Sequence, residues 1–217
     1  MRVFKFGGAS VKDAEGVKNV VRVLAETGHE NTLLVVSAMG KITNAMEAIV
    51  NAYFEDKAEV SAAVQEVVDY HEAILKELFD NPNHAVFSAT KVLVDEVKGF
   101  LAWNKSPKYN FVYDQVVGYG ELLSTTIISA YLREVGIDNI WVDVRNLIKT
   151  GNSYRDVAVN WEKTQERISG GIDRNKLNIT QGFLGSDDNN FTTTLGREGS
   201  DYTAAILGNC LDAEAIE

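Results

Sequence analysis

The chain has 217 residues, 45% of them hydrophobic and 24% charged, and its formal net charge is −10. This composition is typical of a globular domain, and the negative charge, with no compensating basic run, argues against nucleic acid or an anionic membrane as a partner. There is no run of about 18 apolar residues, so we expect no membrane span. Cys210 is the only cysteine and the 3 histidines are scattered, which excludes an internal disulfide, argues against a cysteine–histidine metal cluster and fits a reducing cytoplasm.

A glycine-containing stretch lies close to the N-terminus, directly after a short apolar strand. Lys5 precedes Gly7 and Gly8, Ser10 follows, and Asp13 can cap the next helix. Residues without a Cβ let the main chain approach a ligand closely, and the free amides at a helix start attract anions. The stretch therefore predicts a phosphate-binding loop. The alternative is a plain strand-to-helix turn, because the stretch matches neither the Gly-Lys-Ser/Thr loop nor the three-glycine dinucleotide fingerprint.

A second strand–loop–helix unit follows. Residues 32–36 form a continuous apolar run rich in branched side chains, as in a central parallel strand covered on both faces. The run ends in a small, hydroxyl-bearing loop that contains Ser37, Ala38 and Thr43, before a helix expected over about 45–54. Ligands of open parallel sheets bind beyond the carboxyl ends of the strands. We therefore expect this loop and the first glycine loop to open on the same edge.

The middle of the chain is helical. Apolar stripes with helical spacing and a turn at residues 80–83 predict a hairpin of helices between about 57 and 103. His71 lies on one apolar stripe, which favours a buried structural role over a ligand role. A further helical region over 109–133 is interrupted at residues 118–121. Glu121 stands there beside a predicted helix start, where the helix dipole by itself favours a carboxylate.

Strand and helix patterns alternate again in the last third of the chain. Strands are expected over 139–144, 178–181 and 191–195, with one helix from Asn160 to about 168, ended by Gly170 and Gly171, and a last helix over 201–211. Residues 213–217 resemble the approach to another strand. This alternation predicts a three-layer α/β/α sandwich with a mostly parallel central sheet and a helical insertion.

Taken together, the loops resemble those of the aspartate kinases, within the amino-acid kinase superfamily. The matching motifs occur in the family's order and cover most of the chain: Lys5–Ser10, Val36–Ala38 with Thr43–Asn44, Gly120–Ser124, Gln181–Gly185 and Thr193–Tyr202. Ala9 replaces the family's threonine and so removes a hydroxyl near the phosphates. Glu198 replaces a glycine or small residue, and its negative charge would lower affinity for an anion unless it points to solvent.

The resemblance implies phosphorylation of the β-carboxylate of L-aspartate by ATP, with Mg²⁺, as the first step towards lysine, threonine and methionine. It implies that Lys5 bridges the phosphates, that Arg197 binds the α-carboxylate in a bidentate manner and that Glu121 binds the α-ammonium group. The implied phosphate-binding residues are Lys5, Gly7, Gly8, Ser10, Ser37 and Ala38. The implied aspartate-binding residues are Thr43, Glu121, Phe183, Arg197 and Ser200.

Lys5 and Asp201 are the implied catalytic residues. Asp201 would either orient Lys5 or bind Mg²⁺ together with the phosphates, and both roles suit a carboxylate. Spacing alone leaves another interpretation open, in which Ser200 and Asp201 are the N-cap pair of the last helix.

The resemblance also implies a domain organisation. Residues 1–217 would be the N-terminal portion of one kinase domain, with a helical insertion at about 57–135. The segment that holds the base and ribose, and regulatory domains, would lie outside them. This portion alone would be poorly active. We expect a homo-oligomer in the cytoplasm.

Other functions stay open at this point. One is a kinase of the same superfamily that acts on another carboxylate, a carbamate or a nucleotide monophosphate, although a nucleotide has no ammonium group to match Glu121. Another is an inactive ligand-binding fragment. A dinucleotide-dependent oxidoreductase is disfavoured by the missing glycine fingerprint.

Overall fold

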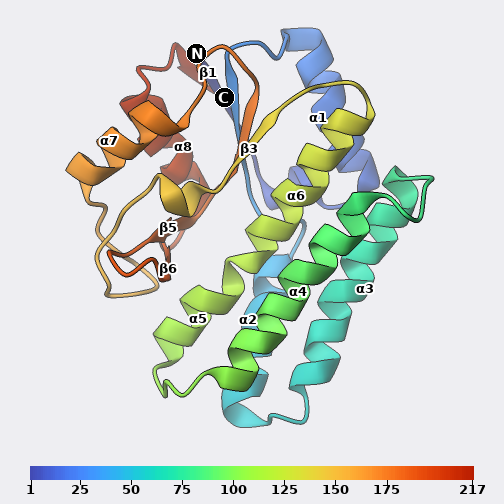
Figure 1. Cartoon of the computed structure of the whole chain (residues 1–217), viewed down its shortest axis with the longest axis vertical. Coiled ribbons are helices and arrows are strands. Elements are labelled where there is room, and N and C mark those ends of the chain that lie inside the picture. Colours follow the sequence, from blue (N-terminus) through green and yellow to red (C-terminus); the bar gives the residue numbers. More distant parts are fainter.

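The computed structural model describes residues 1–217, and strands and helices alternate at both ends of the chain (Figure 1). The strands are β1 (Arg2–Phe6), β2 (Thr32–Val36), β3 (Ile140–Val142), β4 (Asn178–Gln181), β5 (Leu184–Ser186), β6 (Thr192–Thr194) and β7 (Ala215–Ile216). The α-helices are α1 (Ala14–Thr27), α2 (Ile42–Glu55), α3 (Val60–Leu78), α4 (Ala85–Trp103), α5 (Tyr109–Val117), α6 (Tyr119–Glu134), α7 (Trp161–Gly171) and α8 (Gly199–Cys210). Short 3-10 helices occupy Gly8–Val11 and Val144–Asn146.

The main sheet has five parallel strands in the order β3-β4-β2-β1-β7. Every residue of β2 is buried, as predicted for a central strand. Residues on one face of the sheet, such as Leu33 and Val35, pack in a core with α7 and α8. Residues on the other face, such as Leu34 and Val36, pack with α1, α3 and α6. Figure 1 shows these two helical layers on either side of the strands, so the α/β/α architecture predicted from sequence is confirmed.

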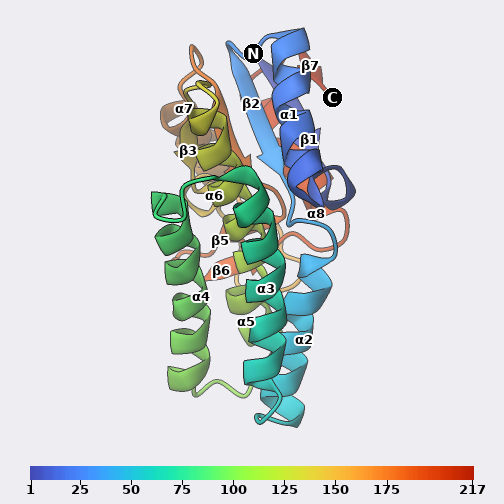
Figure 2. The same ribbon diagram turned by 90° about the vertical axis from the view of Figure 1, so that its right-hand side faces the viewer.

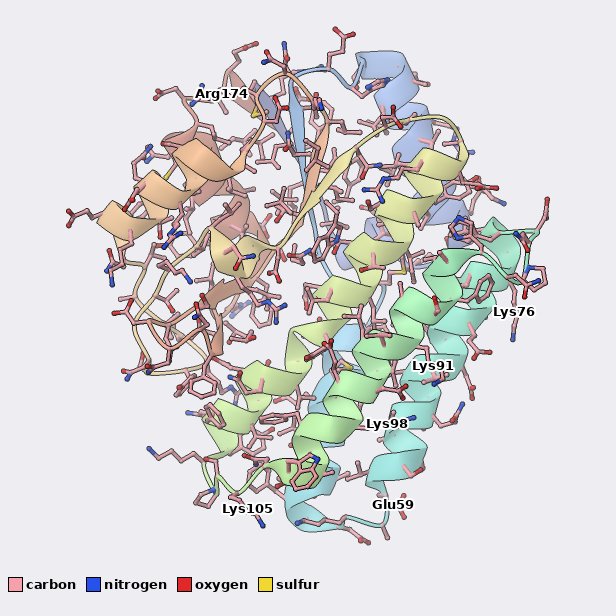
Figure 3. The ribbon with its side chains drawn as sticks, in the orientation of Figure 1. Glu59, Lys76, Lys91, Lys98, Lys105 and Arg174 are labelled. Atoms are coloured by element: carbon pink, nitrogen blue, oxygen red, sulfur yellow. The ribbon has the colours of Figure 1, made fainter.

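A bundle of helices extends from one end of the sheet. Figure 2 shows α2, α3, α4 and α5 side by side at that end, with α6 continuing up to the strands. Buried apolar side chains of α2, α3, α4 and α5 form a core of their own. Lys76, Lys91 and Lys98 project from its outer face (Figure 3), and Lys76 and Lys91 form ion pairs one helical turn away, with Glu72 and Asp95. No helix is both long and apolar enough to cross a membrane.

The predicted helical hairpin is present as α3 and α4. His71 of α3 is 3% exposed, and its Nδ1 lies 2.8 Å from the carbonyl oxygen of Val67. Because a carbonyl only accepts, Nδ1 carries the hydrogen. Burial lowers the pKa of His71 to about 4, so the ring is neutral at physiological pH. The buried position expected for this histidine is confirmed.

Several element boundaries differ from the sequence-based expectation. Helix α2 begins at Ile42 instead of Ala45, and β3 is shorter than residues 139–144. Helix α7 runs beyond the expected residue 168 and ends at Gly171, within the predicted glycine pair. A Cβ at Gly171 would lie 2.4 Å from Cδ2 of Leu147, so close packing also requires glycine at this position.

The C-terminal third contains two further differences. The segment around Thr192–Thr194 does not join the main sheet but pairs with β5 in a separate two-stranded antiparallel sheet. Helix α8 begins at Gly199, with Glu198 as its N-cap, so the N-cap interpretation of Ser200 and Asp201 is wrong. The tail forms β7 beside β1, which confirms the expected approach to a strand.

Candidate active site

A cavity of about 530 Å³ lies where β1, β2 and β4 end. Because these strands are parallel, their carboxyl ends meet at one edge of the sheet, where ligands of open α/β sheets bind. The first turns of α6 and α8 also reach this cavity. All but one of the residues implied from sequence line it, namely Lys5, Gly7, Gly8, Ser37, Ala38, Thr43, Glu121, Phe183, Arg197, Ser200 and Asp201.

The loops after β1 and β2 touch each other at the glycine stretch. The amide of Gly40 donates a hydrogen bond of 2.9 Å to the carbonyl of Gly8. A Cβ at Gly8 would lie only 2.8 Å from the carbonyl oxygens of Ala38 and Gly40. Glycine is therefore required here for loop-to-loop contact, whether or not a phosphate is bound.

Ser10 is the residue that the structure places outside the cavity. It is exposed within the short 3-10 helix, and its amide donates to the carbonyl of Gly7 at 2.9 Å. Ala9, beside it, is also exposed and does not line the cavity. In this conformation, the hydroxyl that the family has at position 9 would lie outside the lining as well.

Lys5 and Asp201 form an ion pair at the edge of the cavity. Lys5 Nζ lies 3.0 Å from Asp201 Oδ1, and the two side chains are 23% and 60% exposed. Lys5 comes from β1 and Asp201 from the first turn of α8, so this pair links the glycine stretch to the last helix. At this exposure the pair contributes little to stability, and its value is the placement of a positive charge in the cavity.

Ser37, Gly182 and Ser200 bring three segments together behind this pair. The Ser37 hydroxyl donates to the Ser200 hydroxyl at 2.8 Å, which joins the loop after β2 to α8. A Cβ at Gly182 would lie 2.5 Å from the same Ser200 oxygen. The end of β4 can therefore approach α8 this closely only with glycine at position 182.

Glu121 carries a buried carboxyl group that has no positively charged partner. It is 2% exposed in the first turn of α6, and its Oε1 accepts a 3.3 Å hydrogen bond from the amide of Ala38. Its Oε2 has no hydrogen-bond partner. Burial raises the pKa of Glu121 to about 8, and the Ala38 amide only partly opposes this. A positively charged ligand group in the cavity would relieve this unfavourable burial.

Phe183, between β4 and β5, and Arg197, just before α8, also line the cavity. Phe183 has φ +71, held by its amide donating to the hydroxyl of Thr203 at 2.9 Å. Arg197 is exposed, and Glu198 after it lines the cavity with φ +56. The glycine that the family prefers at position 198 suits this left-handed backbone better than a residue with a Cβ.

Sequence reasoning missed several residues of the lining. Gly40, Gly196 and Gly199 lie within or beside the motifs, so their proximity was available as a signal. Tyr113 and Arg155 were not singled out. Tyr113 belongs to an apolar helical stripe and Arg155 to an irregular loop, and neither position carries a local pattern that indicates a site.

The fold and this cavity define an amino acid kinase domain. The family model described as "Amino acid kinase family" matches residues 1–217, so the chain belongs to that family. The chain is 32% identical to the chloroplastic bifunctional aspartokinase/homoserine dehydrogenase 2 of Arabidopsis thaliana, over 99% of this chain and 24% of that protein. It is also 32% identical to the lysine-sensitive aspartokinase 3 of Escherichia coli (strain K12), over 99% of this chain and 47% of that protein.

Solved structures agree with this assignment. The crystal structure of E. coli aspartokinase III in complex with aspartate and ADP superposes with a TM-score of 0.87 at 29% sequence identity. The match covers 100% of this chain and 48% of that one. The chain thus spans about a quarter to a half of the length of the relatives it matches.

Proposed function

We propose that the protein phosphorylates the β-carboxylate of L-aspartate with ATP. The observation that carries the proposal is the buried carboxyl group of Glu121, which has no cationic partner and lies in the same cavity as Arg197 and Lys5. An α-amino acid offers an ammonium group for the first and a carboxylate for the second. The relatives named above are aspartokinases, and the E. coli structure holds aspartate and ADP, which supports the same substrates here.

The aspartate-binding residues fix the acceptor by its backbone end. Glu121 ionises when the α-ammonium group enters, because the new positive charge compensates the cost of a buried carboxylate. Arg197 binds the α-carboxylate through two parallel N–H donors, a planar match that lysine lacks. With the α-ammonium and α-carboxylate groups both held, Thr43, Phe183 and Ser200 leave the β-carboxylate directed towards the nucleotide.

The transfer step then needs positioning and positive charge more than acid–base chemistry. A β-carboxylate oxygen attacks the γ-phosphorus, and the bond to the β,γ-bridging oxygen breaks as ADP leaves. The attacking carboxylate is ionised at neutral pH, so no general base is required. Lys5 stabilises the negative charge on the transferring group, and the loop amides near Gly7, Gly8 and Ala38 hold the phosphate oxygens, with the Ser37 hydroxyl. Asp201 holds the Lys5 ammonium in place at 3.0 Å.

The residues of this site could bind Mg²⁺ only together with the phosphates of the nucleotide. No cluster of three histidine, cysteine or carboxylate side chains able to hold a metal is present. Asp201 is an exposed carboxylate at the phosphate end, and Mg²⁺ commonly binds one or two carboxylates together with substrate phosphates and water. When bound, the ion would neutralise phosphate charge, with Asp201 as its protein ligand.

The wider biology follows from the same proposal. β-Aspartyl phosphate formation would place the protein at the start of the route from aspartate to lysine, threonine and methionine. A cytoplasmic homo-oligomer that binds ATP remains our expectation, and chloroplast proteins are among the relatives.

The test is a coupled ADP-release assay on the full-length protein, with L-aspartate, with L-glutamate and without acceptor. We expect turnover with aspartate and far less with glutamate. The extra methylene of glutamate misplaces the reacting carboxylate when the α-carbon is held by Glu121 and Arg197. Equal rates with glutamate, or activity only with a carbamate or nucleotide acceptor, would contradict the proposal.

A further inference from the structure

Arg155 and Arg197 line the same cavity from segments far apart in sequence. Arg155 lies in the irregular segment before α7, and Arg197 precedes α8. The two segments are in contact, because a Cβ at Gly196 would lie 3.4 Å from the carbonyl oxygen of Arg155 and 3.0 Å from Oδ1 of Asp156. The fold therefore places a second arginine beside the one implied from sequence.

The backbone of Arg155 is anchored by a buried carboxylate. Its φ is +67, a left-handed value that is uncommon for a residue with a Cβ. Its amide donates to both carboxylate oxygens of Asp114, at 3.1 and 2.9 Å. Asp114 is fully buried and also accepts from the amide and the hydroxyl of Thr194. These hydrogen bonds tie the segment to both α5 and β6 and fix the backbone position of Arg155.

The Arg155 side chain is oriented yet has unused donors. Its guanidinium carbon lies 4.2 Å from the ring centroid of Tyr113, and stacking of this kind fixes the plane of the group. Its one ion pair is with Glu47 Oε1, at 3.4 Å. A guanidinium group has five N–H donors, so an edge remains available for a second carboxylate.

Two observations support a place for Arg155 beside the implied aspartate-binding residues. Its ion-pair partner Glu47 lies one turn after Thr43 on the same face of α2, and Thr43 lines the cavity. The charge distribution in the cavity also supports this position of Arg155. Lys5 is already paired with Asp201, and Glu198 adds a negative charge beside Arg197. Arg155 offsets that added negative charge where the acceptor carboxylate would bind.

We propose that Arg155 binds the α-carboxylate of the acceptor together with Arg197, and so makes the site selective for acceptors with a free α-carboxylate. This inference rests on the proposed function. It adds a substrate-binding residue that none of the sequence motifs contains, in a loop whose backbone is held by Asp114.

The test compares L-aspartate with its α-amide, which keeps the ammonium group and the reacting β-carboxylate. The variant is Arg155→Gly, because glycine adopts φ +67 without strain and the loop should keep its shape. Controls are Asn31→Gly, at another left-handed position with φ +52, and Arg174→Gln, an exposed arginine far from the cavity (Figure 3). kcat and KM are measured by ADP release on the full-length protein.

We expect Arg155→Gly to raise the KM for aspartate on the order of tenfold, the effect of losing one hydrogen-bonded charge contact, with little change in kcat or in the KM for ATP. The preference for aspartate over the α-amide should fall by a similar factor. Both controls should keep the normal preference. Glu47→Gln removes the ion pair but leaves the arginine, so it should also keep that preference.

The outcomes separate the two proposals. If the unaltered protein shows no aspartate-dependent ADP release, the proposed function fails and the inference fails with it. If the unaltered protein is active and Arg155→Gly keeps the full preference for aspartate over its α-amide, the inference alone is wrong. A loss of preference in Glu47→Gln equal to that in Arg155→Gly would assign Arg155 a purely structural role and also overturn the inference.

Discussion

Replacing Glu121 with Gln should make the ligand-free protein more stable, and increasingly so as the pH rises. The side chain is buried, and its Oε2 has no partner. Glutamine is nearly isosteric, and its side-chain oxygen can keep the hydrogen bond from the Ala38 amide. The substitution therefore removes an ionisable group from a buried position at little steric cost.

The magnitude follows from the pKa of Glu121, which burial raises from its ordinary 4.5 to about 8. The folded protein holds the proton more tightly than the unfolded chain, so the free energy of unfolding falls as pH rises between these values. The slope is about 1.4 kcal/mol per pH unit while the folded group stays protonated. Between about pH 6 and pH 8, the free energy of unfolding of the Gln variant should therefore rise by about 2 kcal/mol relative to that of the unaltered protein.

The assay is urea denaturation at several pH values, with Glu66→Gln, an exposed change on α3, as the control. The control should follow the unaltered protein at every pH. Saturating L-aspartate should reduce the pH dependence of the unaltered protein, because the bound ammonium favours the ionised carboxylate. A Gln variant whose stability runs parallel to that of the unaltered protein from about pH 6 to pH 8 would refute the reasoning.

Three other substitutions test the remaining assignments. Lys5→Met should lower kcat by a factor of roughly 10²–10³ with the fold intact. The control Lys41→Met changes an exposed residue outside the cavity and should leave kcat nearly unchanged. Near-normal turnover of Lys5→Met in the ADP-release assay would contradict the assignment of Lys5 to the phosphates. Arg197→Lys should raise the KM for aspartate but not for ATP, and a defect confined to ATP would move Arg197 to the phosphate end. Glu198→Gly should raise the free energy of unfolding by about 1 kcal/mol, because glycine suits φ +56, and should tighten anion binding; a destabilised variant in urea denaturation would contradict this.

Much of the fold follows from local patterns that the sequence contains. The continuous apolar run of residues 32–36 requires cover on both faces, and it is the buried central strand of a parallel sheet. Asp13 and Asn160 cap their helices as their side chains predict. Because parallel strands end at a common edge, the loops that carry Gly7, Ser37 and Phe183 had to meet, and the order of motifs was enough to name most of the cavity lining.

Features that depend on residues far apart in the sequence were decided only by the tertiary structure. No local pattern distinguishes a glutamate at a helix start from one that is buried without a cation, as Glu121 is. Arg155 reaches the cavity through Asp114 and Tyr113, about 40 residues earlier in the chain, and no spacing rule links them. Helix α8 begins directly after Glu198, whose left-handed backbone no local pattern in the sequence predicts. Local propensity sets the elements, whereas burial and the pairing of charges are properties of the assembled fold.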